Sequence, residues 1–269
     1  MSPTQTAGGT SNASADDLIF ACDVNLGFPT DDPEWAAFFR DHGWRTENYD
    51  DMEQLTAALK AHVPSAAFMP AANYFYLKDD PLYAGLASAL AERTGHTTVT
   101  SVLIAPRTSN ARSVMDLRGK RLGHINSYCT TSYFSPAILL AEHNVPFRTF
   151  FSTVEPVGAW QRQIDAVLAG RVDATMVEEG IWLGKPANQA QTKIIGSVDG
   201  LPGPVIVLAK TVDPAFASAF LAKLLACRTA APAQPFLGYT RYCRDAVQAF
   251  FDRSERAFAV TASQTGDIT

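Results

Sequence analysis

The stretch SVMDLRGKRLGHINSYCTTSYFSPAILLAEHNV, residues 113–145, contains the signals that decide the fold. A short helical turn and a glycine precede an apolar strand that ends near Ile125. A polar turn follows, and a second helix is predicted from about Ser132 to Asn144. Six consecutive side chains at this junction, 127–132, carry a hydroxyl or a thiol. One hydroxyl is enough to cap a helix, so the cluster predicts a further role.

This polar turn predicts a site for an anion. The first N–H groups of a helix have no partner within the helix, and the helix dipole makes this end partially positive. Phosphate groups therefore bind at helix N-termini. The hydroxyls of Thr130, Thr131 and Ser132 would add donors beside those amides. We expect the turn to bind a phosphate, phosphonate or carboxylate group without an arginine.

Strand-like and helical segments alternate on both sides of the turn. Strands are predicted at 18–24, 44–49, 65–70, 97–106, 147–151, 173–179, 192–198 and 204–210, and helices at 32–43, 51–62, 160–170, 213–230 and 239–258. Such alternation is typical of an α/β fold with a mostly parallel sheet covered by helices.

Composition excludes several classes of protein. A chain of 269 residues with 47% hydrophobic and 18% charged residues is long enough for one large α/β domain or two lobes. A net charge of −5 with scattered Lys and Arg argues against nucleic-acid binding. No apolar run has the length of a transmembrane segment. The histidines and cysteines lack metal-site spacing, so we expect no metal and no cofactor.

The central stretch resembles the phosphate/phosphite/phosphonate-binding proteins of ABC importers. That family has a DLkGKr turn, a Ser-Thr-Ser-Gly anion loop with a proline inside the next helix, and a later V..GkvDa junction. The matching segments here are DLRGKR at 116–121, CTTS at 129–132 with Pro136, and VLAGRVDA at 167–174. The similarity extends over roughly 18–225 and is most specific in the central third.

The resemblance implies a type 2 periplasmic-binding-protein fold. In that fold two α/β lobes, joined by two hinge crossovers, hold the ligand in the cleft between them, and the cleft closes by hinge motion. The predicted domains are a disordered tail at 1–17, lobe one at 18–104 and 206–269, and lobe two at 105–205.

The resemblance also implies a set of ligand-binding residues. Cys129, Thr130, Thr131 and Ser132 occupy the anion loop. Glu178 ends a strand at the edge that faces the crevice in open α/β sheets. In the family a carboxylate near this place meets the polar or cationic end of the ligand, which would suit a zwitterion.

Further candidates come from the rest of the cleft. Trp160 would stack on a flat ligand. Asn73 and Tyr76 follow the third strand, and Asn25, close to Asp23, follows the first.

Several positions depart from the family pattern. Cys129 and Ser132 replace a serine and a glycine, Trp160 or Gln161 stands where a histidine is expected, and Val99 aligns with a tyrosine. We therefore expect the anion site to be retained while the contacts around it differ.

Two functions remain open at this stage. The first is a solute-binding protein for a small anionic or zwitterionic ligand, working with an ABC permease. The alternative is an intracellular enzyme on the same scaffold, acting on a small carboxylate or phosphorylated metabolite. There Cys129, a thiol at a helix N-terminus, would be the nucleophile and Glu178 the base. A ligand-sensing regulatory module is a third reading.

The compartment is open as well. The N-terminus lacks the basic start and apolar core of a secretory signal. The protein is expected to be cytoplasmic if the chain is complete, and periplasmic or extracellular if a signal peptide has been removed. In an oxidising compartment Cys227 and Cys243 could pair.

Overall fold

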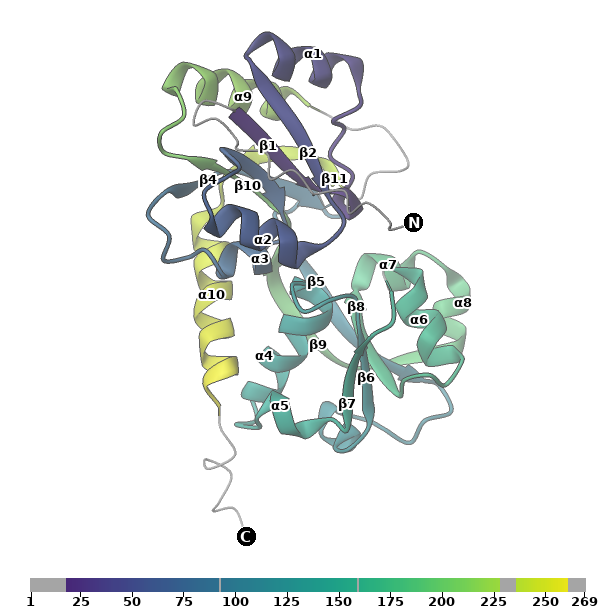
Figure 1. Ribbon diagram of the computed structural model, residues 1–269. Helices are drawn as coiled ribbons and strands as arrows, with labels where there is room; N and C mark the ends of the chain where they lie inside the picture. Colours follow the sequence, from purple (N-terminus) through teal and green to yellow (C-terminus); the bar gives the residue numbers. More distant parts are fainter. Residues whose placement is uncertain (1–17, 92, 159, 228–235, 261–269) are drawn as a thin grey trace, which may run out of the picture.

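The computed structural model describes residues 18–91, 93–158, 160–227 and 236–260, which form two lobes with one sheet each (Figure 1). The expected N-terminal tail, 1–17, lies outside the described residues. The two-lobe architecture agrees with the prediction.

Lobe one contains a six-stranded sheet of order β11-β4-β10-β3-β1-β2. β1 pairs in parallel with β2 and β3, whereas β10 is antiparallel to β3 and β4. The helices α1 and α9 lie on one face and α2 and α3 on the other (Figure 1). The strands are β1 (Leu18–Asp23), β2 (Trp44–Tyr49), β3 (Ala66–Met69), β4 (Tyr83–Ala91), β10 (Val205–Ala209) and β11 (Phe236–Arg241). The helices are α1 (Pro33–Asp41), α2 (Met52–Lys60), α3 (Ala71–Phe75), α9 (Pro214–Ala226) and α10 (Arg244–Ala259).

Lobe two contains a five-stranded sheet of order β7-β6-β8-β5-β9. β6 is parallel to β7 and β8, and β5 is antiparallel to β8 and β9. The strands are β5 (Thr98–Pro106), β6 (Arg121–His124), β7 (Thr153–Pro156), β8 (Ala174–Glu178) and β9 (Thr192–Pro202). The helices are α4 (Ser135–Ala141), α5 (Phe147–Phe150), α6 (Gln161–Leu168), α7 (Glu179–Leu183) and α8 (Pro186–Gln191). Short 3-10 helices lie at Val24–Leu26 and Val114–Leu117, and a π-helical turn at Thr130–Phe134 precedes α4.

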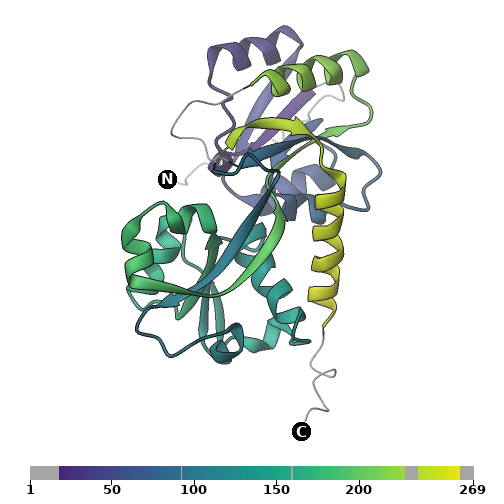
Figure 2. The ribbon, with the colours of Figure 1, turned by 180° about the vertical axis from the view of Figure 1, so that it is seen from behind.

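The two crossovers between the lobes are short. β4 ends at Ala91 and β5 begins at Thr98, while β9 ends at Pro202 and β10 begins at Val205. Figure 2 shows β5 and β9 running side by side from one lobe into the other. The predicted boundary at 104/105 falls inside β5, which pairs with β9 from Thr98 to Pro106.

Some elements follow local sequence rules closely. The Asp32 carboxylate accepts the N–H groups of Glu34 and Trp35 at the start of α1, with Pro33 at the first helical position. Others do not. The strand predicted at 147–151 is wrong: those residues form α5, which buries Phe147 and Phe150, and the strand is β7.

Three further elements differ from the prediction. The sequence reading did not find β4 or β11, and the helix predicted from residue 239 begins at Arg244 because β11 occupies 236–241. The expectation of mostly parallel sheets is also wrong, since the strands next to the crossovers run antiparallel to their neighbours.

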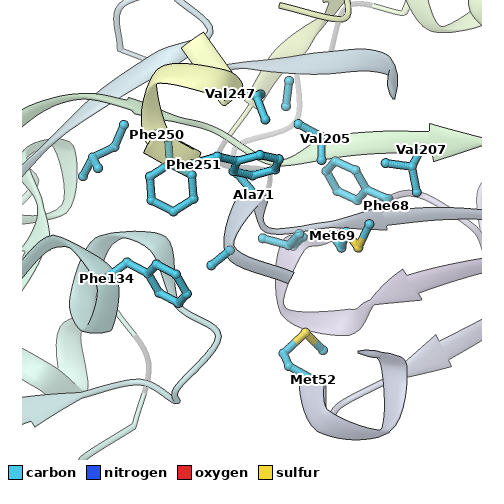
Figure 3. Close-up of a cluster of buried hydrophobic side chains, with 14 of the residues drawn as sticks. Met52, Phe68, Met69, Ala71, Phe134, Val205, Val207, Val247, Phe250 and Phe251 are labelled. Atoms are coloured by element: carbon cyan, nitrogen blue, oxygen red, sulfur yellow. The ribbon is translucent and has the colours of Figure 1, made fainter. Parts of the chain in front are cut away.

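Helix α10 joins the two lobes on one side (Figure 1). It follows β11 of lobe one but packs against α4 and β9 of lobe two. Its residues Phe250 and Phe251 belong to the same buried cluster as Phe134 of lobe two and Ala71 of lobe one (Figure 3). The ring centroids of Phe134 and Phe250 are 5.5 Å apart. The buried apolar core is therefore continuous from lobe to lobe.

Candidate functional site

A cavity of about 100 Å³ lies between the lobes, and residues at both crossovers line it. Its lining is mainly apolar, with Leu26, Val99, Ile125, Ile181, Phe236 and the proline-glycine-proline of the second crossover, 202–204. The polar and aromatic lining residues come from both lobes: Asp23, Asn25, Asn126, Cys129, Thr130, Thr131, Trp160, Gln163 and Glu178. A small apolar cavity with a few converging polar groups is the usual form of a ligand site.

One wall of the cavity is the π-helical turn at Thr130–Phe134, which we call the anion loop. The N–H groups of Tyr133 and Phe134 both donate to the Cys129 carbonyl, at 3.1 and 3.2 Å. The N–H groups of residues 130–132 precede these bonds and have no acceptor within the helix. They form the donor set that the sequence predicts for an anion.

The hydroxyls of the loop have different roles. The Ser132 side chain is fully buried, lies outside the lining, and accepts the Ile125 N–H at 3.0 Å, which ties the loop to the end of β6. The Thr130 hydroxyl oxygen accepts the Ala72 N–H of lobe one at 3.2 Å. Thr131 lines the cavity, with its hydroxyl oxygen 3.5 Å from the Cys129 sulfur. The hydroxyls of Ser132 and Thr130 thus hold the loop in place, and the Thr131 hydroxyl contributes least to the structure of the loop.

A buried carboxylate from lobe one faces the same cavity. Asp23 ends β1, is 4% exposed, and accepts the backbone N–H and the side-chain Nδ2–H of Asn25 at 2.8 and 3.0 Å. Burial raises the pKa of Asp23, and the two hydrogen bonds from Asn25 partly oppose that rise. Asn25 therefore holds the carboxylate in place at the cavity.

Lobe two supplies a second carboxylate and an amide. Glu178 ends β8, lines the cavity and lies opposite Ser101 of β5. Gln163, which the sequence reading missed, is 1% exposed and donates through Nε2 to the Thr175 hydroxyl and the Met176 carbonyl. In the sequence, Gln163 could have been noticed as a polar residue on the apolar face of α6, one turn after Trp160.

Trp160 lines the cavity at the start of α6 with a backbone φ of 56°. A positive φ is uncommon for a bulky residue and costs about 1–3 kcal/mol, which the surrounding structure must offset. Such outliers cluster at ligand sites.

Besides Ser132, two of the predicted residues lie away from the cavity. Asn73 is fully buried and donates to the Met52 carbonyl and the Thr56 hydroxyl, so it anchors α3 to α2. Tyr76 is 38% exposed on the outside of the lobe junction, where its ring contacts that of Tyr128 with centroids 5.1 Å apart. Neither side chain lines the cavity.

The charges of the cavity wall are unusual for an anion site. Among the described residues that line it there are two carboxylates and no lysine or arginine. An anionic group must therefore be held by amides and hydroxyls, and a cationic group would be stabilised by Asp23 and Glu178. In the part of the chain that the structure describes, no cluster of His, Cys, Asp or Glu could hold a metal ion, and no helix is long and apolar enough to cross a membrane.

Comparisons with known proteins agree with this geometry. The family of ABC transporter, phosphonate, periplasmic substrate-binding proteins matches residues 45–241, which is most of the chain. No curated protein matches the sequence. Among solved structures, XAC2383 from Xanthomonas citri bound to ATP has a TM-score of 0.73 at 17% identity, with 91% of this chain and 98% of that chain covered.

Two phosphonate-related structures are also similar. PhnD1 from Prochlorococcus marinus in complex with methylphosphonate has a TM-score of 0.64 at 11% identity, covering 89% of this chain and 97% of that one. A binding protein component of an ABC phosphonate transporter from Pseudomonas aeruginosa has a TM-score of 0.63 at 17% identity, covering 91% and 90%. These likenesses confirm the predicted type 2 periplasmic-binding-protein fold.

Proposed function

We propose that this chain, which belongs to the phosphonate substrate-binding family of ABC transporters, binds a small phosphonate that also carries an amino group. Family membership makes it a solute-binding protein for a small anionic ligand, with a permease as partner. The zwitterionic ligand is our proposal, as are the residues that bind it.

The observation that supports this ligand is the division of the cavity wall into two chemically opposite parts. The anion loop offers backbone N–H groups and the Thr131 hydroxyl. Asp23 and Glu178, from different lobes, offer carboxylates. A ligand with an anion at one end and an ammonium at the other satisfies both parts, because each charged group then has a partner of opposite sign or charge-assisted hydrogen bonds.

The size of the cavity supports a small ligand. A volume of about 100 Å³ is well below the roughly 300–1,000 Å³ of pockets for drug-sized molecules. Methylphosphonate, the ligand of the PhnD1 structure, is closer to this size than ATP, the ligand of the Xanthomonas protein. We therefore place 2-aminoethylphosphonate ahead of nucleotides as a probe.

Calorimetric titration and thermal melting with four probes test the proposal: 2-aminoethylphosphonate, methylphosphonate, inorganic phosphate and ATP. We expect binding in that order, with ATP weakest. A ligand at 100 times its Kd stabilises the fold by about 2.7 kcal/mol, which gives a clear rise in Tm. No rise with any phosphonate or phosphate would overturn the anion loop as the site. Equal affinity for the first two probes would overturn the role of the carboxylates.

The catalytic alternative has less support from the site. The Cys129 sulfur lies 3.5 Å from the Thr131 hydroxyl, and that group is no general base. Mass spectrometry of each probe after incubation with the protein provides the check, and unchanged probes are the expected result.

A further inference from the structure

The anion loop contains a carbonyl group to which no backbone N–H of the π-helical pattern can donate. In this π-helical turn the N–H of residue i+5 donates to the carbonyl of residue i, as Ser135 N–H does to Thr130 O. The next bond of this pattern would join Thr131 O to the nitrogen of residue 136. That residue is Pro136, which has no N–H. Thr131 O is therefore left without its backbone donor.

Two buried serines supply the missing donors. The Ser101 hydroxyl donates to Thr131 O at 2.7 Å, and the Ser135 hydroxyl donates to the same oxygen. Both side chains are 0% exposed, and their oxygens are 3.2 Å apart. A carbonyl oxygen has two lone pairs, so the two hydroxyls can satisfy it completely. Without them a partly buried acceptor would lie unpaired, which is unfavourable.

The position of Ser101 links this carbonyl to the rest of the site. Ser101 lies in β5, one of the two strands that continue from the crossovers, where it pairs with Glu178 on one side and Val198 on the other. Its hydroxyl is also 3.3 Å from the Val177 carbonyl of β8. The Ser101 hydroxyl has one hydrogen, which Thr131 O accepts, so the anion loop is fastened to β5, the strand that connects the lobes and pairs with the Glu178 end of β8.

We infer that Ser101 and Ser135 are positioning residues for ligand binding. By holding the Thr131 carbonyl, they fix the peptide planes of the loop, so that the N–H groups of 130–132 face the cavity. Neither serine lines the cavity, and both act through Thr131. The inference rests on the proposed function insofar as the loop binds the anion, but the geometry of the loop can be measured without any ligand.

The variants Ser101→Ala and Ser135→Ala test this role, with 2-aminoethylphosphonate and methylphosphonate as probes. We expect each to weaken both probes by roughly tenfold, because the loop amides lose their fixed orientation. Ser101→Cys, which keeps the shape and a weak donor, should restore part of the affinity. Equal losses for the two probes would agree with a role at the anionic end.

Two controls separate positioning from stability. Ser254 is equally buried, and its hydroxyl has no hydrogen-bond partner among the described residues, so Ser254→Ala should leave affinity unchanged. Thr56 is buried in α2 and loses two hydrogen bonds in Thr56→Val, so this variant should lower Tm without changing affinity. An affinity loss in Thr56→Val equal to that of the serine variants would contradict the inference.

Amide resonances of the ligand-free protein give the readout that does not depend on binding. In Ser101→Ala we expect chemical-shift changes and faster hydrogen exchange at Thr131 and Ser132, and none there in Ser254→Ala. If no probe binds the wild type, the proposed function fails while this comparison still decides the inference. The inference would be overturned by unchanged chemical shifts and exchange rates of the loop amides in Ser101→Ala. It would also be overturned by wild-type affinity in the variant that combines Ser101→Ala with Ser135→Ala.

Discussion

The two walls of the cavity differ in the groups that they offer to a charged ligand. In lobe two the anion loop uses backbone N–H groups, which any residue except proline can provide, so its function depends on shape. In lobe one the Asp23 carboxylate depends on one side chain, held by Asn25 at 2.8 and 3.0 Å. Substitutions should therefore separate the walls: side-chain changes affect lobe one strongly and lobe two mildly, while changes of loop geometry affect lobe two.

The largest expected effect is that of Asp23→Asn. This change keeps the shape but removes the negative charge that would face the ligand ammonium. Charge-assisted hydrogen bonds are worth about 1.5–3 kcal/mol, so 2-aminoethylphosphonate should bind about 10- to 100-fold more weakly. Methylphosphonate has no ammonium and should bind at least as well as to the wild type. Parallel calorimetric titrations measure the difference, and equal losses for both ligands would place Asp23 outside the ammonium site.

A smaller effect is expected for Thr131→Val, which removes one of the loop hydroxyls that line the cavity and keeps the backbone. One hydrogen bond to a charged ligand is lost, so both phosphonates should bind roughly tenfold more weakly. Thr130→Ala should have a similar effect on affinity but should also lower Tm, because it removes the acceptor of the Ala72 N–H. Wild-type affinity in both variants would move the anion to another part of the wall.

The pH dependence sharpens the role of Asp23. Burial raises its pKa above 3.8, so it takes up a proton at a higher pH than an ordinary aspartate. The affinity advantage of the wild type over Asp23→Asn for 2-aminoethylphosphonate should shrink as pH falls through that pKa. Dividing the affinity of the wild type by that of Asp23→Asn at each pH cancels the effect of the titration of the phosphonate itself. A ratio close to one at every pH would show that the Asp23 charge does not contribute.

The stability of the ligand-free protein should change in the opposite direction. Because the folded pKa is raised, the folded state holds this proton above pH 3.8 and the unfolded state does not. Asp23 therefore lowers stability as pH rises from 3.8 to its folded pKa. Urea unfolding at several pH values should show that Asp23→Asn lacks this loss.

Sequence reasoning located the polar turn at the cavity wall better than it located the other lining residues. The loop is contiguous, and a cluster of hydroxyls at a strand-to-helix junction is a local signal. The helix predicted at 32–43 also rests on local signals, and the structure has α1 there with Asp32 as its N-cap. Asn73 followed a strand end as a ligand residue should, but its side chain turns into lobe one, and burial against α2 cannot be inferred from chain order.

Long-range contacts explain the other differences. β4 and β11 were missed because their small and mixed side chains have no strict alternation, and they become strands by pairing with each other. Gln163 and Ser101 look like ordinary polar residues in the sequence. Their roles depend on Thr175 and Thr131, which are 12 and 30 residues away. The departure of Ser132 from the family glycine also has a structural reason, since its hydroxyl accepts the Ile125 N–H.

The smallest effect is expected for Cys129→Ser, and it tests whether the loop depends on shape. Cys129 contributes its carbonyl to the turn, accepting the N–H groups of Tyr133 and Phe134, and serine keeps that carbonyl. A serine hydroxyl also replaces the thiol next to the Thr131 hydroxyl with a similar size and better hydrogen bonding. Affinity for both phosphonates should change by less than about threefold. As a control, alkylation of the wild-type thiol with a bulky reagent should block binding, because Cys129 lines the cavity. A loss of more than tenfold in the serine variant would show that the thiol itself takes part in binding, and turnover that disappears with it would favour the enzyme.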